Sequence, residues 1–290
     1  MGVSQVISSV VFGLSMASIY FLLSIGLSLC YGLMRIISID QFLYYTIGAY
    51  LTFTICSVSG NFWLGTLAGI GISCAVAFIV EKVVFRRIYE KGIMFSMITS
   101  FGILLTGIGI TKYIWGLVPR PVATPIPGQI SILGAEVPTY RLFVVGLVVV
   151  LYVCLWLFLE KTIIGKAIRA GIEDAEKTEG LGVDIYKMFT IMFLIAAGLS
   201  ALAGGLHAPL IMVDPHMGLR LMSTAFMIVI IGGLGSIKGT LISSLIIGQV
   251  VSLGFLIWAP IADMAPFVIM LLVFLVKPTG LYGSELMKRR

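Results

Sequence analysis

Long runs without a charged residue constrain this chain more than any other feature of its sequence. Residues 1–34 contain no Asp, Glu, Lys or Arg, and residues 41–80 contain none either. A run of about 20 apolar residues is long enough to cross a bilayer as an α-helix. The chain of 290 residues is 59% hydrophobic and 11% charged, with a mean hydropathy of +1.12. A soluble domain carries about 25% charged residues, so the composition excludes that class and predicts a polytopic membrane protein.

Nine apolar runs predict a single membrane domain over residues 1–290. Each run should be helical, because an open sheet would leave backbone groups unsatisfied in lipid. The predicted fold class is therefore an all-α bundle of eight or nine transmembrane helices. The first run forms one long helix unless Gly13 or Gly26 breaks it into two. The predicted spans are 1–34, 41–58, 62–80, 93–111, 142–159, 188–206, 221–237, 239–258 and 261–276.

The positive charges predict which way the helices face. If the C-terminal tail is cytoplasmic and every run crosses once, 15 of the 19 Lys and Arg residues fall in cytoplasmic segments. Cytoplasmic loops of membrane proteins carry such an excess, so we expect the C-terminus inside and the N-terminus outside. The charges form no basic stripe that could follow a phosphate backbone, so no nucleic acid partner is expected. The four cations predicted outside are Lys112, Arg120, Arg141 and Arg220.

Two connections stand out by their length. Residues 116–141, expected outside, contain five prolines and predict a stiff extended loop. Residues 160–187, expected inside, are far more polar, and a short helix is predicted there from Lys166 to Glu179. An i, i+4 pair such as Arg169 with Glu173 contributes only about 0.3–0.5 kcal/mol. Such pairs do not explain a polar loop of 28 residues, which favours a docking role over a solvated connector.

The sequence lacks the patterns typical of a membrane enzyme or an ion-coupled transporter. His207 and His216 flank an outside loop without a metal-ligand companion, and we interpret them as structural. Secondary transporters usually carry ionisable groups deep in their spans, whereas Asp40, Asp214 and Asp263 lie near predicted span ends. No GxxxxGK[ST] nucleotide-binding motif is present. We therefore expect no catalytic residue, metal or cofactor in this chain, and any motor must be a separate protein.

Several motifs follow one another from about residue 13 to 283. They are residues 26–37 (GLSLCYGLMRII), 47–50 (IGAY), 165–174 (GKAIRAGIED), 203–209 (AGGLHAP), 232–239 (GGLGSIKG) and 277–283 (KPTGLYG). In this order they resemble the membrane-spanning permeases of branched-chain amino acid ABC importers, the LivH/LivM-like subunits. The sequence departs from the family pattern at residues 38–42, at Gln249 and at Ser243-Ser244.

The resemblance implies a function and a set of partners. It implies a permease subunit in a cell inner membrane, paired with a second, identical or related permease. Two cytoplasmic ATPases would use ATP, and an extracytoplasmic solute-binding protein would deliver the solute. That solute is a branched-chain or another neutral amino acid. The alternatives left open are urea or short amides within the same family, and a secondary transporter outside the ABC class.

Polar and small residues inside the spans are the candidates for contact with the solute. A single hydroxyl most often donates to its own i−4 carbonyl, whereas the Gln41 amide must be paired or face water. The glycine-rich residues 232–239 either pack helices closely or break a helix along the pathway, and both can hold. The predicted pathway residues are Ser15, Ser18, Tyr20, Ser38, Gln41, Thr99, Ser100, Gly102, Gly232, Gly233, Gly235 and Ser236. The coupling residues implied by the resemblance are Arg169, Glu173, Asp174, Glu179, Gly180 and Gly182.

Overall fold

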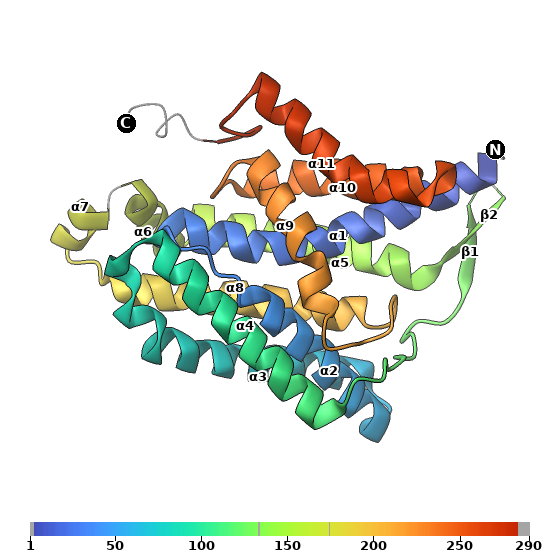
Figure 1. The fold of residues 1–290 in the computed structure, drawn as a ribbon, viewed down its shortest axis with the longest axis horizontal. Coiled ribbons are helices and arrows are strands. Elements are labelled where there is room, and N and C mark those ends of the chain that lie inside the picture. The colour runs from blue at the N-terminus through green and yellow to red at the C-terminus, as the bar shows by residue number, and fades with distance from the viewer. Residues whose placement is uncertain (1–2, 133, 174, 284–290) are drawn as a thin grey trace.

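The computed structural model describes residues 3–132, 134–173 and 175–283, and they form an elongated helical bundle (Figure 1). A short hairpin of β1 (Gln129–Ile132) and β2 (Ala135–Pro138) lies in the proline-rich connection. The helices are α1 (Val3–Met34), α2 (Gln41–Ser59), α3 (Phe62–Val83), α4 (Ile93–Trp115), α5 (Thr139–Lys161), α6 (Ile163–Glu173), α7 (Ala175–Gly180), α8 (Ile185–His207), α9 (Met217–Gly232), α10 (Ile237–Ile257) and α11 (Ala259–Val276).

Eight of the described helices are long and apolar enough to cross a membrane, which confirms the predicted fold class. The first run is one unbroken helix of 32 residues, roughly 48 Å long at 1.5 Å per residue. The predicted turn between the second and third spans is also confirmed. Gly60 adopts a left-handed conformation with φ +68°, and the Asn61 side chain caps α3 by accepting hydrogen bonds from the next amides.

The predicted span over residues 221–237 is displaced in the structure. α9 begins earlier and ends at Gly232, and it has only 16 residues, about 24 Å of helix. Residues 208–216 connect α8 to α9, and Ala208 and Val213 of this connection are fully buried. The glycines after Gly232 adopt backbone conformations that a continuous helix does not contain. The apolar run in the sequence therefore extends beyond the end of the helix.

Glu81 corrects the predicted extent of the third span. The charge at this position marked the start of a loop over residues 81–92, but α3 continues to Val83. The Glu81 side chain is buried and accepts hydrogen bonds from the Tyr89 hydroxyl at 2.8 Å and the Thr190 hydroxyl at 3.1 Å. A buried carboxylate is tolerated when it is paired in this way, so the charge lies inside the bundle and joins α3 to α8.

The centre of the bundle is built from α1, α2 and α8, which contact one another and most of the remaining helices. Small residues bring these backbones close together: a Cβ on Gly48 or Gly204 would collide with the main chain of the facing helix. Such contacts are the usual driving force for helix association in lipid. By contrast, α4, α5 and α11 lie outside and expose apolar side chains such as Met94, Val149 and Leu275.

The two ends of the bundle carry different segments (Figure 1). The α6 and α7 helices lie at one end, and the N-terminus and the β1–β2 hairpin lie at the other. α1 contacts both β2 and α6: Ser4 and Ser8 line a pocket together with Ala135, and Leu33 lies beside Gly171. We refer to the end with α6 and α7 as the coupling end and to the opposite one as the hairpin end.

Candidate functional site

The glycine-rich residues 232–239 form a tight turn between α9 and α10 at the coupling end. Gly233 and Gly235 have φ values of +96° and +84°, a region in which only glycine is unstrained. The Ser236 side chain caps α10 by accepting a hydrogen bond from the Gly239 amide at 3.1 Å. A Cβ on Gly232 would lie 2.5 Å from the Gly239 carbonyl carbon. The turn therefore both breaks the helix and packs two backbones in contact, as the two predicted interpretations allowed.

The C-terminal motif, residues 277–283, closes this turn. The amide of Leu281 donates to the Ile231 carbonyl at 2.8 Å, and the amide of Tyr282 donates to the Gly232 carbonyl at 3.0 Å. The last carbonyl groups of a helix have no partner within the helix. The C-terminal segment supplies those partners for α9, which explains why two motifs so far apart in the sequence occur together.

The polar segment 160–187 forms two helices instead of the single predicted one. α6 ends at Glu173 and α7 begins at Ala175; the predicted coupling residue Asp174 lies outside the described residues. α6 packs on α1, α5 and α8 through a face that includes Gly165, Ile168 and Gly171. A Cβ on Gly165 would collide with the main chain of α5. A rigid short helix is therefore seated directly on the ends of the spans.

The structure adds two details to the predicted coupling helix. Arg169 forms an ion pair with Glu160 of α5 at 2.6 Å. Gly180 is the last residue of α7 and has no positive φ, while Gly182 does, at +86°. The left-handed position after α7 is therefore Gly182, one of the two glycines that the resemblance implied. Glu179 and Gly180 are both exposed.

A buried polar cluster joins α1, α2 and α8 at the start of α2. The Gln41 amide donates to the Ser38 hydroxyl at 3.2 Å and to the Cys30 sulfur at 3.7 Å. Its oxygen accepts a hydrogen bond from the Ser200 hydroxyl at 3.0 Å. Gln41, Ser38 and Ser200 are all fully buried. Of the two environments that the sequence left open for the Gln41 amide, the structure shows the paired one.

Asp40, which the sequence indicated only as a residue near a span end, belongs to the same buried cluster. The Ser38 hydroxyl donates to its carboxylate at 2.5 Å and the Tyr44 hydroxyl at 2.8 Å. Burial raises the pKa of the Asp40 carboxyl above its usual range, and the hydrogen bonds from the two hydroxyls oppose that shift. The i, i+4 spacing of Asp40 and Tyr44 was the signal available in the sequence.

The predicted pathway residues of α1 lie against α9 and α10. Ser18 donates to the Leu14 carbonyl at 2.8 Å, which is the common structural arrangement for a hydroxyl in a helix. Tyr20 packs with Met227 and Ile247. The Ser15 hydroxyl is buried and has no partner among the described residues. α1 is thus the predicted pathway helix closest to the glycine turn.

The predicted pathway residues of α4 lie elsewhere. α4 packs mainly against α2 and makes no extensive contact with α1. Ser100 is buried and donates to the Ile37 carbonyl at 3.1 Å, whereas Thr99 is half-buried and Gly102 is exposed, with open space where a Cβ would be. The structure therefore brings Ser100 near the cluster of Ser38 but does not gather all the predicted pathway residues in one place.

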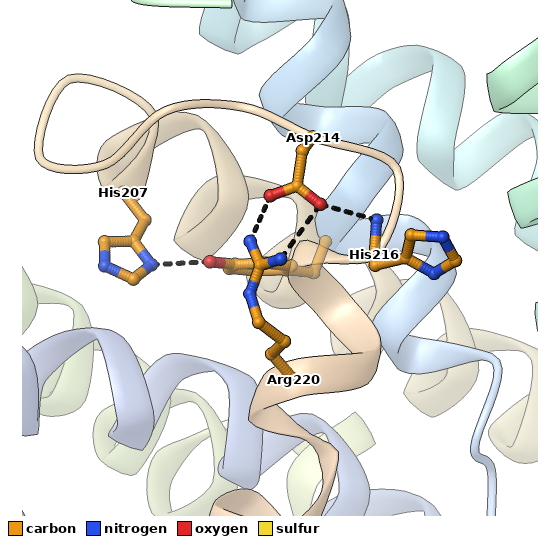
Figure 2. Close-up of polar contacts among 5 residues, drawn as sticks. His207, Asp214, His216 and Arg220 are labelled. Atoms are coloured by element: carbon orange, nitrogen blue, oxygen red, sulfur yellow. Dashed lines mark hydrogen bonds and ion pairs between the residues drawn. The ribbon is translucent and has the colours of Figure 1, made fainter. Parts of the chain in front are cut away.

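At the hairpin end, polar side chains hold the loop between α8 and α9 (Figure 2). Asp214 forms an ion pair with Arg220 and accepts a hydrogen bond from the His216 amide at 2.9 Å. His207 is buried, and its Nδ1 lies 2.5 Å from the Tyr45 hydroxyl. The two histidines do not face one another, and no group of metal-ligating residues occurs among the described residues.

Comparisons with known proteins place the chain in a family. Residues 9–276 match the model of the branched-chain amino acid transport system permease component. The chain belongs to this family. A high-affinity branched-chain amino acid transport permease, LivH of Escherichia coli K12, is 27% identical and the match covers 93% of both chains. BraD of Pseudomonas aeruginosa is 25% identical over 93% of this chain and 94% of its own.

A probable branched-chain amino acid permease of Methanocaldococcus jannaschii is 25% identical, over 93% of this chain and 90% of its own. Among solved structures, PsaBC from Streptococcus pneumoniae in complex with Fab is 15% identical with a TM-score of 0.47, over 99% of this chain and 94% of the other. The family match over residues 9–276 and the eight long apolar helices identify the chain as a multi-pass membrane permease, a transport subunit and not an enzyme.

In this permease four of the six family-like motifs, residues 26–37, 165–174, 232–239 and 277–283, meet in space at the coupling end. Gly235 of the turn lies against Gly32 of the first motif, where a Cβ would come within 3.0 Å of the Gly32 Cα. Gly235 and Ser236 line a cavity together with Arg169 of α6. The predicted pathway turn and the predicted coupling helix, about 65 residues apart in sequence, thus face the same space.

Proposed function

We propose that this permease is one of two membrane subunits of an ATP-driven importer for branched-chain amino acids. The match of residues 9–276 to the permease family carries this proposal. Relatives named as high-affinity branched-chain amino acid permeases align over 93% of the chain, which supports the choice of solute over urea or short amides. The chain itself binds no cofactor in this proposal, and the ATP is used by partner subunits.

The coupling end faces the cytoplasm in this proposal. The excess of Lys and Arg in the segments of that end supports the orientation, and so does the position of the N-terminus with the hairpin at the opposite end (Figure 1). The unbroken α1 removes the second short helix that would have reversed the N-terminus. An inner membrane with the C-terminus inside and the N-terminus outside is the corresponding location.

α6 and α7 form the docking site for an ATPase. Ile163 and Leu181 expose 86% and 83% of their surfaces at this end, and apolar side chains exposed outside the spans are typical of a contact surface. The opposite face of α6 is buried against α1, α5 and α8. Movement of an ATPase against the exposed face therefore transmits directly to the spans.

The other partners contact the remaining surfaces. A second permease, identical or related, completes the pathway, and a solute-binding protein docks at the hairpin end. There Arg120 of the proline-rich connection pairs its backbone with Val213 in the loop before α9. The short α9 and its glycine turn form this subunit's share of the pathway, because a break between helices can place backbone atoms along a pathway. Tyr20 of α1 packs against α9 at Met227, and Gly32 of α1 lies against the turn at Gly235.

Reconstituted vesicles that contain the partner chains test the proposal. Uptake of leucine should require ATP, and urea should not compete with it. Gly182→Val places a β-branched residue at φ +86°, which costs about 1–3 kcal/mol and disturbs the end of α7. We expect it to lower uptake and solute-stimulated ATP hydrolysis at normal abundance of the permease.

The matched control is Gly180→Ala, because a Cβ at that exposed position meets nothing within 4 Å. It should transport like the parent. Competition by urea but not by isoleucine would overturn the choice of solute. Full ATP-coupled uptake by Gly182→Val would overturn the coupling role of this segment.

A further inference from the structure

A cavity of about 210 Å³ opens at the coupling end between α1, α5, α6 and the turn before α10. Its floor is one face of α1, with Ser28, Leu29 and Gly32 separated by the spacing of a helical turn. Most of its lining is apolar, and Trp156 and Leu159 of α5 form one wall. The cavity therefore offers an apolar surface at the level where the spans end and the polar segment begins.

Two buried polar atoms of this cavity lack a partner. The Ser28 hydroxyl is fully buried and makes no hydrogen bond to any described residue. A serine in a membrane helix commonly donates to its i−4 carbonyl, so an unpaired Ser28 is a departure. The Arg169 Nε is also buried and unpaired, although the other end of the guanidinium binds Glu160 at 2.6 Å. Both residues line the cavity, and both atoms are hydrogen-bond donors without an acceptor among the described residues.

The first turn of α10 adds positive potential to the cavity rim. The amides of Ile237 and Lys238 precede the first intrahelical hydrogen bond, and helix N-termini with such free amides attract anions. The Lys238 side chain belongs to the same rim. Glu160 neutralises Arg169, so the Lys238 ammonium and the helix terminus leave the site with a net positive charge.

We propose that this cavity binds one anionic phospholipid of the leaflet at the coupling end. The phosphate would accept hydrogen bonds from the Ser28 hydroxyl, the Arg169 Nε and the first amides of α10, while an acyl chain would lie along Trp156 and Leu159. A free phosphate ion would leave the apolar wall uncovered, and a neutral acyl chain alone would leave the donors unpaired. Only a molecule with both parts fits the lining, and a membrane supplies it.

The site has a consequence for the transport cycle. Its walls come from the coupling helix α6 and from the turn that ends α9, so the bound lipid contacts both parts. Any movement of α6 relative to the turn changes the shape of the cavity. A lipid held there therefore favours one arrangement of the two segments over another.

Native mass spectrometry of the full-length chain in a maltoside detergent tests the site. Dioleoyl phosphatidylglycerol should bind at a stoichiometry of one, and dioleoyl phosphatidylcholine should bind more weakly. Lys238→Gln should weaken the phosphatidylglycerol complex about fivefold, and Ser28→Ala, which keeps the fold because it only removes a hydroxyl, about tenfold. Lys91→Gln, at the same end but outside the cavity, should bind like the parent.

Three outcomes would overturn the proposal. The first is equal binding of the two lipids by the parent chain. The second is binding of phosphatidylglycerol that neither Ser28→Ala nor Lys238→Gln weakens relative to Lys91→Gln. The third is displacement of the lipid by millimolar inorganic phosphate, which would assign the donors to a free anion.

Discussion

The two ends of α9 are held in place by different chemistry. At the coupling end, the carbonyls of Ile231 and Gly232 accept hydrogen bonds from the C-terminal segment, and the backbones of Gly232 and Gly239 touch. At the hairpin end, the loop before α9 is held by the ion pair of Asp214 with Arg220 (Figure 2). The coupling end is held mainly by main-chain contacts, whereas at the hairpin end a side-chain ion pair supplements the backbone pairing of Arg120 with Val213.

This difference shows which end can change shape at low cost. Backbone contacts between glycines leave no room for adjustment, because packed interiors respond to added volume by strain. A partly exposed ion pair contributes little to the free energy of unfolding, because water can hydrogen-bond to the separated partners. This applies to Arg220, since 58% of its side chain is exposed. The hairpin end of α9 can therefore rearrange by side-chain motion, whereas the coupling end moves as a unit with α10 and the C-terminal segment.

The largest expected effect is that of Gly239→Ala. The added Cβ would collide with the Gly232 carbonyl oxygen, and such overpacking costs about 3 kcal/mol. We expect a large fall in membrane abundance and in the thermal unfolding temperature. Gly109→Ala is the matched control, because a Cβ on Gly109 meets nothing within 4 Å; it should be as stable as the parent. Normal stability of Gly239→Ala would mean that the turn is not held by backbone contact.

A smaller effect is expected from Gln41→Leu, also at the coupling end. The substitution leaves the Ser200 hydroxyl without its acceptor in a fully buried site, which costs about 1–3 kcal/mol. Thermal unfolding should show this loss. Gln249→Leu serves as the comparison. It removes a hydrogen bond to the Val10 carbonyl from a half-buried side chain, so the loss of stability should be smaller than in Gln41→Leu. A stable Gln41→Leu permease with impaired uptake would instead place Gln41 in the pathway, as the sequence suggested.

The sequence predicted the number and type of the helices because transfer to lipid depends on composition, which charge-free runs report directly. It could not predict which helices lie at the centre. Lipid-facing and protein-facing residues in a membrane are both apolar, so nothing distinguished α2 from α4. Hydropathy also placed Glu81 outside the third span. In the structure Glu81 is buried inside α3, where its carboxylate is paired with two hydroxyl groups. The glycine motif predicted a break, and the side chains that close the hairpin end were missed.

Substitutions in the ion pair at the hairpin end should have the smallest effect on stability. Arg220→Gln leaves the Asp214 carboxylate, of which only 13% is exposed, with the His216 amide as a remaining partner. Because the Arg220 side chain is largely exposed, we expect a loss of about 1 kcal/mol or less in the free energy of unfolding, decreasing further at high salt. Asp214→Asn should cost slightly more, since it also weakens the hydrogen bond to the His216 amide.

The double variant that combines Arg220→Gln with Asp214→Asn distinguishes a direct ion pair from two separate effects on stability. If the pair holds the loop, the losses of the single variants should not add, and the double variant should be about as stable as Asp214→Asn alone. Thermal unfolding in detergent at two salt concentrations measures the coupling. Additive, salt-independent losses, or a loss as large as that of Gly239→Ala, would show that the hairpin end is as rigid as the coupling end. The contrast between the two ends of α9 would then be wrong.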